Sequence, residues 1–138
     1  RVMYATVSKP NRTHVNILPI EREWSETCRC HIAAADAERA GDEACCIFDY
    51  FDEVVSVDDA GDVGKDQPDV YLLAASRLGV EPGECTVFED LLIGMRSAKS
   101  VGMKVWAMHD DSSDADWPAI CGLADGVMFD FHDAPAVL

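Results

Sequence analysis

The sequence predicts an α/β fold built on a parallel sheet. Through the second half of the chain, short apolar runs alternate with segments of helical periodicity, and turn residues separate them. That alternation is typical of parallel strands joined by crossover helices. The 138 residues are 49% apolar, which is enough to bury a core, so a single domain over residues 1–138 is expected.

Five apolar runs are predicted to be strands. They span residues 2–6, 54–57, 86–88, 104–108 and 126–129. Each is short and apolar, and those in the second half are bounded by turn or helical segments, as buried strands of a parallel sheet are.

Helical spacing and stop signals predict the intervening helices. Pro68 opens a helix whose apolar residues recur at helical intervals up to Gly79, which ends it. Residues 93–101 form a second helix closed by Gly102, and residues 117–121 a short third one. In the first half, residues 33–38 are predicted to be helical, whereas no element is assigned to residues 19–29.

The charge balance excludes several classes of partner. The net charge is −15, from 26 acidic and 11 basic residues, which disfavours nucleic acid and anionic membranes. No apolar run approaches the roughly 20 residues of a membrane span, and no signal peptide is recognisable, so a cytoplasmic location is expected. The acidity serves solubility, or some of the carboxylates hold a divalent cation.

Six cysteines are expected to be reduced thiols. They are Cys28, Cys30, Cys45, Cys46, Cys85 and Cys121. Cys85 and Cys121 lie in apolar stretches and are predicted to be small core residues. The alternative, a zinc site formed by Cys28, Cys30 and His31 with the later cysteine pair, does not match common ligand spacings.

Polar residues follow three of the predicted strands, and the carboxyl ends of parallel strands share one edge of the sheet. Glu89 and Asp90 come directly after residues 86–88, Lys65 follows residues 54–57, and Thr6, Ser8 and Lys9 lie at the end of the first strand. Hydroxyl and ammonium groups suit a phosphoryl group, and carboxylates suit Mg²⁺.

Each of these residues also has a simpler interpretation. Asp90 precedes a helix and is a candidate N-cap, since acidic residues are common there. Lys65 on its own is typical of a surface lysine, and Thr6 and Ser8 of turn formers.

Longer motifs favour the functional interpretation. Residues 64–71 read G-K-D-Q-P-D-V-Y, residues 87–94 V-F-E-D-L-L-I-G and residues 98–103 A-K-S-V-G-M. Together with the stretch around residues 110–126, they resemble the haloacid dehalogenase (HAD) superfamily of hydrolases in its β-phosphoglucomutase-like branch. The resemblance covers roughly residues 51–134.

The resemblance implies a three-layer Rossmann-like core and an enzyme that transfers phosphoryl groups. Such an enzyme is a phosphatase or phosphomutase that uses Mg²⁺ and an aspartyl-phosphate, and its substrate is a small phosphorylated metabolite. Lys65 matches the lysine that steadies the transferring phosphoryl group. Asp90 matches a magnesium ligand, with Glu89 at or near the metal, and Thr6 matches the hydroxyl of the phosphate-holding motif.

The sequence departs from this family in its nucleophile. The Asp-x-Asp-x-Thr motif that carries the attacking aspartate is missing, and the segment M-F-D-F-H-D at residues 128–133 has neither its spacing nor its position. The nucleophile strand and the substrate-selecting cap are therefore expected to precede Arg1, leaving an open position in the sheet between residues 2–6 and 86–88. We also expect the chain alone to be inactive.

Two other functions remain open at this stage. One is a non-catalytic fragment or pseudoenzyme that binds a partner or a metal. The other is a receiver-type signalling domain, although no aspartate pair ends the first strand.

Overall fold

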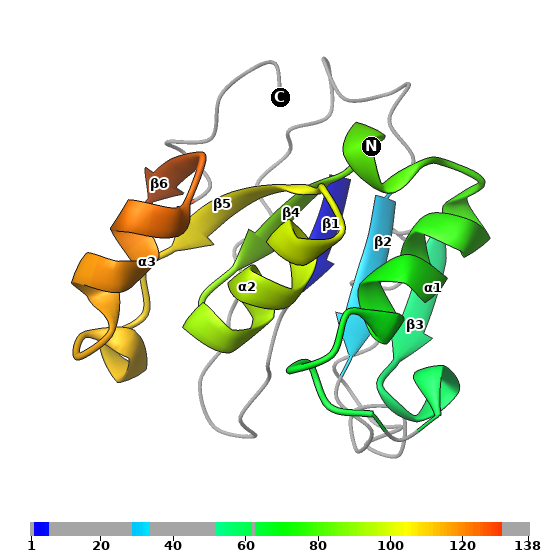
Figure 1. Cartoon of the computed structure of the whole chain (residues 1–138), viewed down its shortest axis with the longest axis horizontal. Coiled ribbons are helices and arrows are strands. Elements are labelled where there is room, and N and C mark those ends of the chain that lie inside the picture. Colours follow the sequence, from blue (N-terminus) through cyan, green and yellow to red (C-terminus); the bar gives the residue numbers. More distant parts are fainter. Residues whose placement is uncertain (1, 6–28, 34–51, 62, 131–138) are drawn as a thin grey trace.

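A six-stranded parallel sheet organises the protein (Figure 1). The computed structural model describes residues 2–5, 29–33, 52–61 and 63–130, with the first two segments described as backbone strands. In spatial order the strands are β3 (Glu53–Ser56), β2 (Arg29–Ala33), β1 (Val2–Ala5), β4 (Thr86–Glu89), β5 (Lys104–Met108) and β6 (Gly126–Met128). Every neighbouring pair is parallel, so the carboxyl ends lie along one edge.

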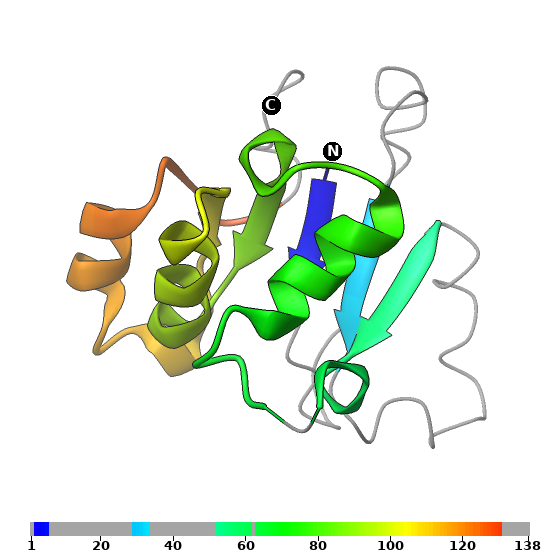
Figure 2. The ribbon, with the colours of Figure 1, turned by 45° about the vertical axis from the view of Figure 1, so that its right-hand side comes forward.

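In the described part of the chain, three α-helices follow strands of this sheet: α1 (Asp69–Leu78), α2 (Leu92–Ser100) and α3 (Trp117–Leu123). Short 3₁₀ turns precede them, namely η2 (Asp58–Ala60), η3 (Pro82–Glu84) and η4 (Asp111–Ser113). Figures 1 and 2 show the three α-helices on the same face of the sheet. Gly79 ends α1 in a left-handed conformation with a φ of 67°, as its position in the sequence predicted.

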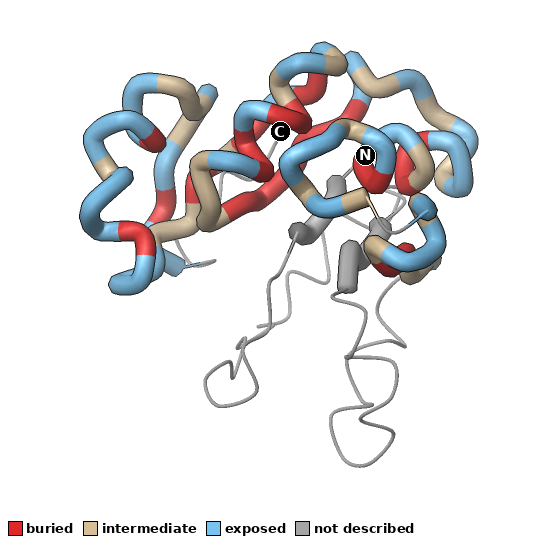
Figure 3. The backbone as a smooth tube through the Cα atoms, turned by 60° about the horizontal axis from the view of Figure 1, so that its bottom comes forward, coloured by how far each residue is buried: buried red, intermediate tan, exposed pale blue. Residues whose placement is uncertain are grey.

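The core lies between the sheet and these helices. The pleat turns Val55, Val87 and Val105 towards the helices, where they pack against buried residues of α1, α2 and α3. Those helix residues are Val70, Tyr71, Ala74, Ala75, Met95, Ala98 and Ile120. Figure 3 shows the result as buried stretches along the strands and along the helix sides that meet them, with exposed residues on the outer sides. Within the described residues, no helix is long and apolar enough to cross a membrane.

All five predicted strands and the three helices of the second half are present, with bounds that differ from the predicted ones by at most two residues. The helix predicted at residues 33–38 is wrong at its start, because Ala33 ends strand β2. Residues 34–38 lie outside the described part. Neither Cys85 nor Cys121 forms a disulfide with another described residue. Cys85 is buried, as predicted, but Cys121 is exposed, since it follows the inward-facing Ile120 by one helical position.

The expected open position in the sheet is also wrong. β1 pairs directly with β4, with Val2 opposite Thr86 and Tyr4 opposite Phe88, and β2 pairs with the other edge of β1. Both backbone edges of β1 are therefore satisfied by neighbouring strands of the same chain. The hydrogen-bonding argument for a missing central strand does not hold.

Asp125 links the segment before β6 to helix α2 and strand β5. Its carboxylate accepts two hydrogen bonds of 2.8 Å from Lys99 of α2 and one of 2.7 Å from the backbone N–H of Val105 in β5. Burial alone would raise the pKa of Asp125, but these donors outweigh it and hold the pKa below its ordinary value. The ionised form is thus bound more tightly in the folded state than in the unfolded chain.

We expect Asp125→Asn to lower the thermal midpoint at neutral pH. A carboxylate whose pKa is depressed by folding adds stability above its unfolded pKa of about 3.9 and loses that contribution as the pH falls through the folded value. The difference between variant and wild type should therefore shrink between pH 7 and pH 3, as measured by thermal melting. Asp116→Asn, which removes an exposed carboxylate without a capping hydrogen bond, is the control. A pH-independent difference for Asp125→Asn would contradict the assignment.

Candidate active site

Glu89 is the centre of a buried polar network at the carboxyl end of β4. It is fully buried and shares the helix-facing side of the strand with Val87. Its Oε2 accepts a 2.9 Å hydrogen bond from the hydroxyl of Tyr71 and lies 3.4 Å from Nζ of Lys65. Its Oε1 accepts from the backbone N–H groups of Asp90 and Leu91, each at 3.3 Å. A charged side chain without solvent is thus surrounded by donors, as burial requires.

Lys65 reaches this network from the loop between η2 and α1. Its side chain is only 10% exposed, so the interpretation as a surface lysine is wrong. Lys65 Nζ lies 3.4 Å from Glu89 Oε2. A close N⁺–H···O⁻ hydrogen bond is shorter, at about 2.7–2.9 Å. The ammonium therefore balances the charge of Glu89 without being held tightly by it.

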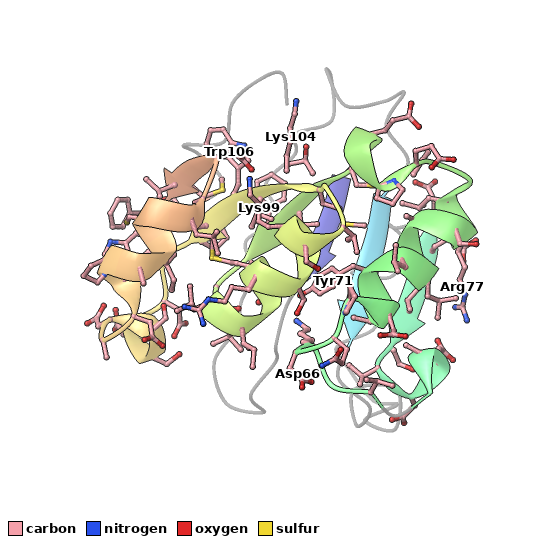
Figure 4. All side chains as sticks on the ribbon, in the orientation of Figure 1. Asp66, Tyr71, Arg77, Lys99, Lys104 and Trp106 are labelled. Atoms are coloured by element: carbon pink, nitrogen blue, oxygen red, sulfur yellow. The ribbon has the colours of Figure 1, made fainter. Side chains whose placement is uncertain are left out.

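Tyr71 and Gly94 complete the wall around Glu89. Tyr71 lies on the buried side of α1 with its ring between α1 and α2 (Figure 4). Gly94 of α2 lies opposite, and a Cβ atom there would stand 2.6 Å from the Tyr71 hydroxyl oxygen and 2.7 Å from Glu89 Oε2. Glycine is therefore needed at position 94, because any side chain would displace the two groups that meet there.

Asp90 follows Glu89 directly, and its charge acts on both Glu89 and Tyr71. The N-cap of α2 is Leu91, and no side-chain capping hydrogen bond is formed, so the prediction of Asp90 as an N-cap is wrong. Within the described part of the chain, its Oδ1 is buried and lacks a hydrogen-bond partner. A buried carboxylate oxygen without a donor is costly unless a cation or another donor completes its surroundings.

The electrostatics of the network follow from burial. Burial raises the pKa of Glu89 to about 7, and the nearby positive charge of Lys65 opposes that rise. Burial also raises the pKa of Tyr71, and the negative charge of Glu89 adds to the effect. Tyr71 therefore keeps its proton and is the donor towards Glu89. A cation near the two carboxylates would favour the ionised form of Glu89.

The donor set fits Mg²⁺. This ion prefers oxygen ligands and is commonly held by one or two carboxylates, with water and phosphate oxygens completing six positions. Asp90 Oδ1 is available for such a role, whereas both oxygens of Glu89 already accept hydrogen bonds. Among the side chains described, those of residues 52–61 and 63–130, there is no cluster of three or more metal-binding groups.

Several predicted residues cannot be placed against this network. Thr6, Ser8 and Lys9 lie outside the described residues, as do Cys28, Cys45 and Cys46 of the zinc alternative. Cys30 and His31 lie on β2, whose backbone alone is described. The structure brings Lys65, from the loop before α1, to Glu89 and Asp90 at the end of β4, although Lys65 and Glu89 are 24 residues apart in the sequence.

Tyr71 and Gly94 are the site residues that sequence reasoning missed. Tyr71 carries no distinct signal in the sequence, because an aromatic residue beside the apolar residues Val70 and Ala74 of a helix is ordinarily part of the core. Gly94 did carry a signal, since a glycine inside a helix costs about 1 kcal/mol relative to alanine and commonly marks a close approach.

The fold and the network together define a class of protein: an open parallel α/β sheet with carboxylates and a lysine at the carboxyl edge, where such sheets bind ligands. Residues 29–102 match the haloacid dehalogenase-like hydrolases. The chain belongs to this family and is by family a hydrolase.

Individual relatives support this membership. The chain is 39% identical over 92 residues to the protein CbbY of Rhodobacter capsulatus, a match covering 62% of this chain and 37% of CbbY. It is 46% identical over 54 residues to the fructose-1-phosphate phosphatase YqaB of Escherichia coli, covering 39% of this chain and 28% of that one. A crystal structure of a putative β-phosphoglucomutase from Thermotoga maritima aligns with a TM-score of 0.60 and 26% identity, over 73% of this chain and 47% of that chain. The matches therefore span about a quarter to a half of the relatives' lengths.

Proposed function

We propose that these residues form the metal- and phosphate-binding part of a Mg²⁺-dependent phosphatase or phosphomutase acting on a small phosphorylated metabolite. One observation carries the proposal: Asp90 Oδ1 is buried without a hydrogen-bond partner among the described residues, beside a buried glutamate and a lysine. The names of the relatives are consistent with it, since one is a fructose-1-phosphate phosphatase and another a putative β-phosphoglucomutase.

Each residue has a distinct role in this proposal. Asp90 would hold the cation, and Glu89 would orient the segment that carries Asp90 through the N–H groups of Asp90 and Leu91. Lys65, largely shielded from solvent, would face the charge that develops on the transferring phosphoryl group. Thr6, Ser8 and Lys9 would bind phosphate oxygens. Bound Mg²⁺ would supply neutralisation of negative charge on the phosphoryl group.

The covalent chemistry proposed follows the family resemblance. An aspartate attacks phosphorus, the bond to the ester oxygen breaks, and the alcohol leaves with a proton from a second acid. Water then releases phosphate from the aspartyl-phosphate. No Asp-x-Asp-x-Thr motif supplies the nucleophile within the 138 residues. We propose that a segment outside them provides it, and that the 138-residue chain alone gives no turnover.

The experiment is binding of orthophosphate to the 138-residue chain, measured by calorimetry with and without Mg²⁺. We expect binding to require Mg²⁺ and to weaken by about tenfold or more in Lys65→Ala, because one close charge contact to phosphate is worth roughly 1.5–3 kcal/mol. Far-ultraviolet circular dichroism should show that the variant remains folded.

Lys104→Ala is the control. Lys104 is exposed and lies at the amino end of β5, whereas the site lies at the carboxyl ends of the strands. Phosphate binding that is independent of Mg²⁺ and unchanged in Lys65→Ala would overturn the proposed function.

A panel of phosphorylated metabolites assayed in parallel tests the absence of turnover. Mg²⁺-dependent phosphate release by the chain itself would contradict the requirement for an external nucleophile. Phosphate binding that does not depend on metal would instead favour a non-catalytic binding domain.

A further inference from the structure

We propose that Tyr71 is a positioning residue: its hydroxyl fixes the Glu89 carboxylate so that Lys65 Nζ and Asp90 Oδ1 remain available to phosphate and cation. The inference rests on the proposed function, since it assigns a device that supports the same site. It adds a residue of helix α1 to a site whose charged groups come from the loop before α1 and from the end of strand β4.

The first step concerns which donor holds Glu89 Oε2. The Tyr71 hydroxyl lies 2.9 Å from this oxygen, whereas Lys65 Nζ lies 3.4 Å from it. An ammonium group facing a buried carboxylate ordinarily closes to about 2.7–2.9 Å. The hydroxyl makes the close contact instead, which leaves the ammonium at a distance from which it can turn towards a second anion.

The second step concerns Oε1. This oxygen accepts from the N–H groups of Asp90 and Leu91, so the orientation of the Glu89 carboxylate is coupled to the peptide units that carry Asp90. Rotation of the carboxylate would break both contacts. A donor that locks Oε2 therefore also fixes the direction in which Asp90 leaves the strand.

The third step is that the space around the hydroxyl is shaped for it. Tyr71 is fully buried among apolar core residues, and its one polar side-chain atom meets Glu89. Across from it, Gly94 has no side chain, and a Cβ atom there would come within 2.6 Å of the hydroxyl oxygen. Phenylalanine would fill nearly the same volume, so packing alone does not require the hydroxyl. What the hydroxyl adds is the hydrogen bond to Glu89.

The test is Tyr71→Phe in the 138-residue chain, with Mn²⁺ as a paramagnetic probe of the cation site and Mg²⁺ as competitor. We expect the Mn²⁺ dissociation constant to rise about tenfold, because removing a group that orients a metal carboxylate costs roughly 10- to 100-fold in affinity. Ser97→Ala is the matched control. It deletes another buried hydroxyl, one that donates to the Ile93 carbonyl at 3.2 Å within α2 and does not touch Glu89.

A second comparison places the effect on Glu89. If Tyr71 acts through that carboxylate, adding Tyr71→Phe to Glu89→Gln should change the Mn²⁺ affinity by less than twofold, although each single variant weakens it. Wild-type Mn²⁺ affinity in Tyr71→Phe would overturn the inference, even if stability fell as it does in Ser97→Ala. Equal weakening in both backgrounds would overturn it too, since the hydroxyl would then act independently of Glu89.

The outcomes separate this inference from the proposed function. Loss of Mn²⁺ binding in Asp90→Asn together with intact binding in Tyr71→Phe leaves the function standing and removes the positioning role. Intact binding in Asp90→Asn removes the function, whatever Tyr71→Phe does. Urea denaturation of every variant shows whether it is folded under the conditions of the titration.

Discussion

Asp90→Asn is expected to weaken Mg²⁺ binding by about 100-fold or more, the upper end of what loss of a supporting group alone costs at a metal site. The substitution keeps the shape of the side chain and removes its charge. Asp90 Oδ1 is the buried oxygen for which no donor is found among the described residues, so its charge has the most to gain from a cation. Calorimetric titration of the 138-residue chain with Mg²⁺ measures the effect directly.

The same substitution should leave the fold stable or stabilise it when no metal is present. A buried carboxylate without a partner opposes folding, and an amide carries a smaller desolvation cost. Asp116→Asn removes one negative charge from an exposed position and should leave the Mg²⁺ affinity within about twofold, as expected for a screened surface charge. Unaltered Mg²⁺ binding in Asp90→Asn would sink the assignment of Asp90 as a ligand.

Gly94→Ala is expected to destabilise the protein by about 2 kcal/mol or more. Alanine in place of glycine normally stabilises a helix by up to about 1 kcal/mol. Here the added methyl group would stand 2.6–2.7 Å from Tyr71 and Glu89, inside any tolerable contact distance. Overpacking of this kind costs about 1–3 kcal/mol, and a disrupted buried hydrogen bond adds roughly 1–3 kcal/mol, so the packing term wins.

Thermal melting should show a fall of roughly 5–10 °C for Gly94→Ala, given the few degrees per kcal/mol that domains of this size show. Gly122→Ala is the matched control because Gly122 also lies in a helix, α3, and a Cβ atom there meets nothing within 4 Å. It should be neutral or slightly stabilising. Equal melting temperatures for Gly94→Ala and wild type would show that Tyr71 and Glu89 can move away from a Cβ atom at little cost. The requirement for glycine at position 94 would then be wrong.

The elements of the second half could be predicted because local signals there agree with the fold. Gly79 lies at the left-handed end of α1, and the strand from Lys104 to Met108 was found with its observed bounds. The place of Lys65 beside Glu89 was also predictable, since parallel strands bring the loops at their carboxyl ends together.

The first half was harder because its local signals are weak. Strand β2 reads R-C-H-I-A, which mixes charged and polar residues with apolar ones and lacks both a long apolar run and a clear alternation. Its identity as a strand comes from pairing with β1 on one side and β3 on the other. These pairing partners are far apart in the sequence, so no local sequence pattern predicts the pairing.

From the sequence alone it could be predicted that the second half is α/β, that an acidic pair follows a buried strand, and that a lysine belongs to the same edge of the sheet. These properties depend on local spacing and on the parallel connection of neighbouring elements. Three further features depend on the folded chain: β1 pairs directly with β4, Tyr71 donates to Glu89 across from Gly94, and Asp90 Oδ1 is buried without a donor among the described residues. The physical reason is that hydrogen bonding and burial depend on which atoms meet in space, and side chains on different elements meet only once the helices have packed on the sheet.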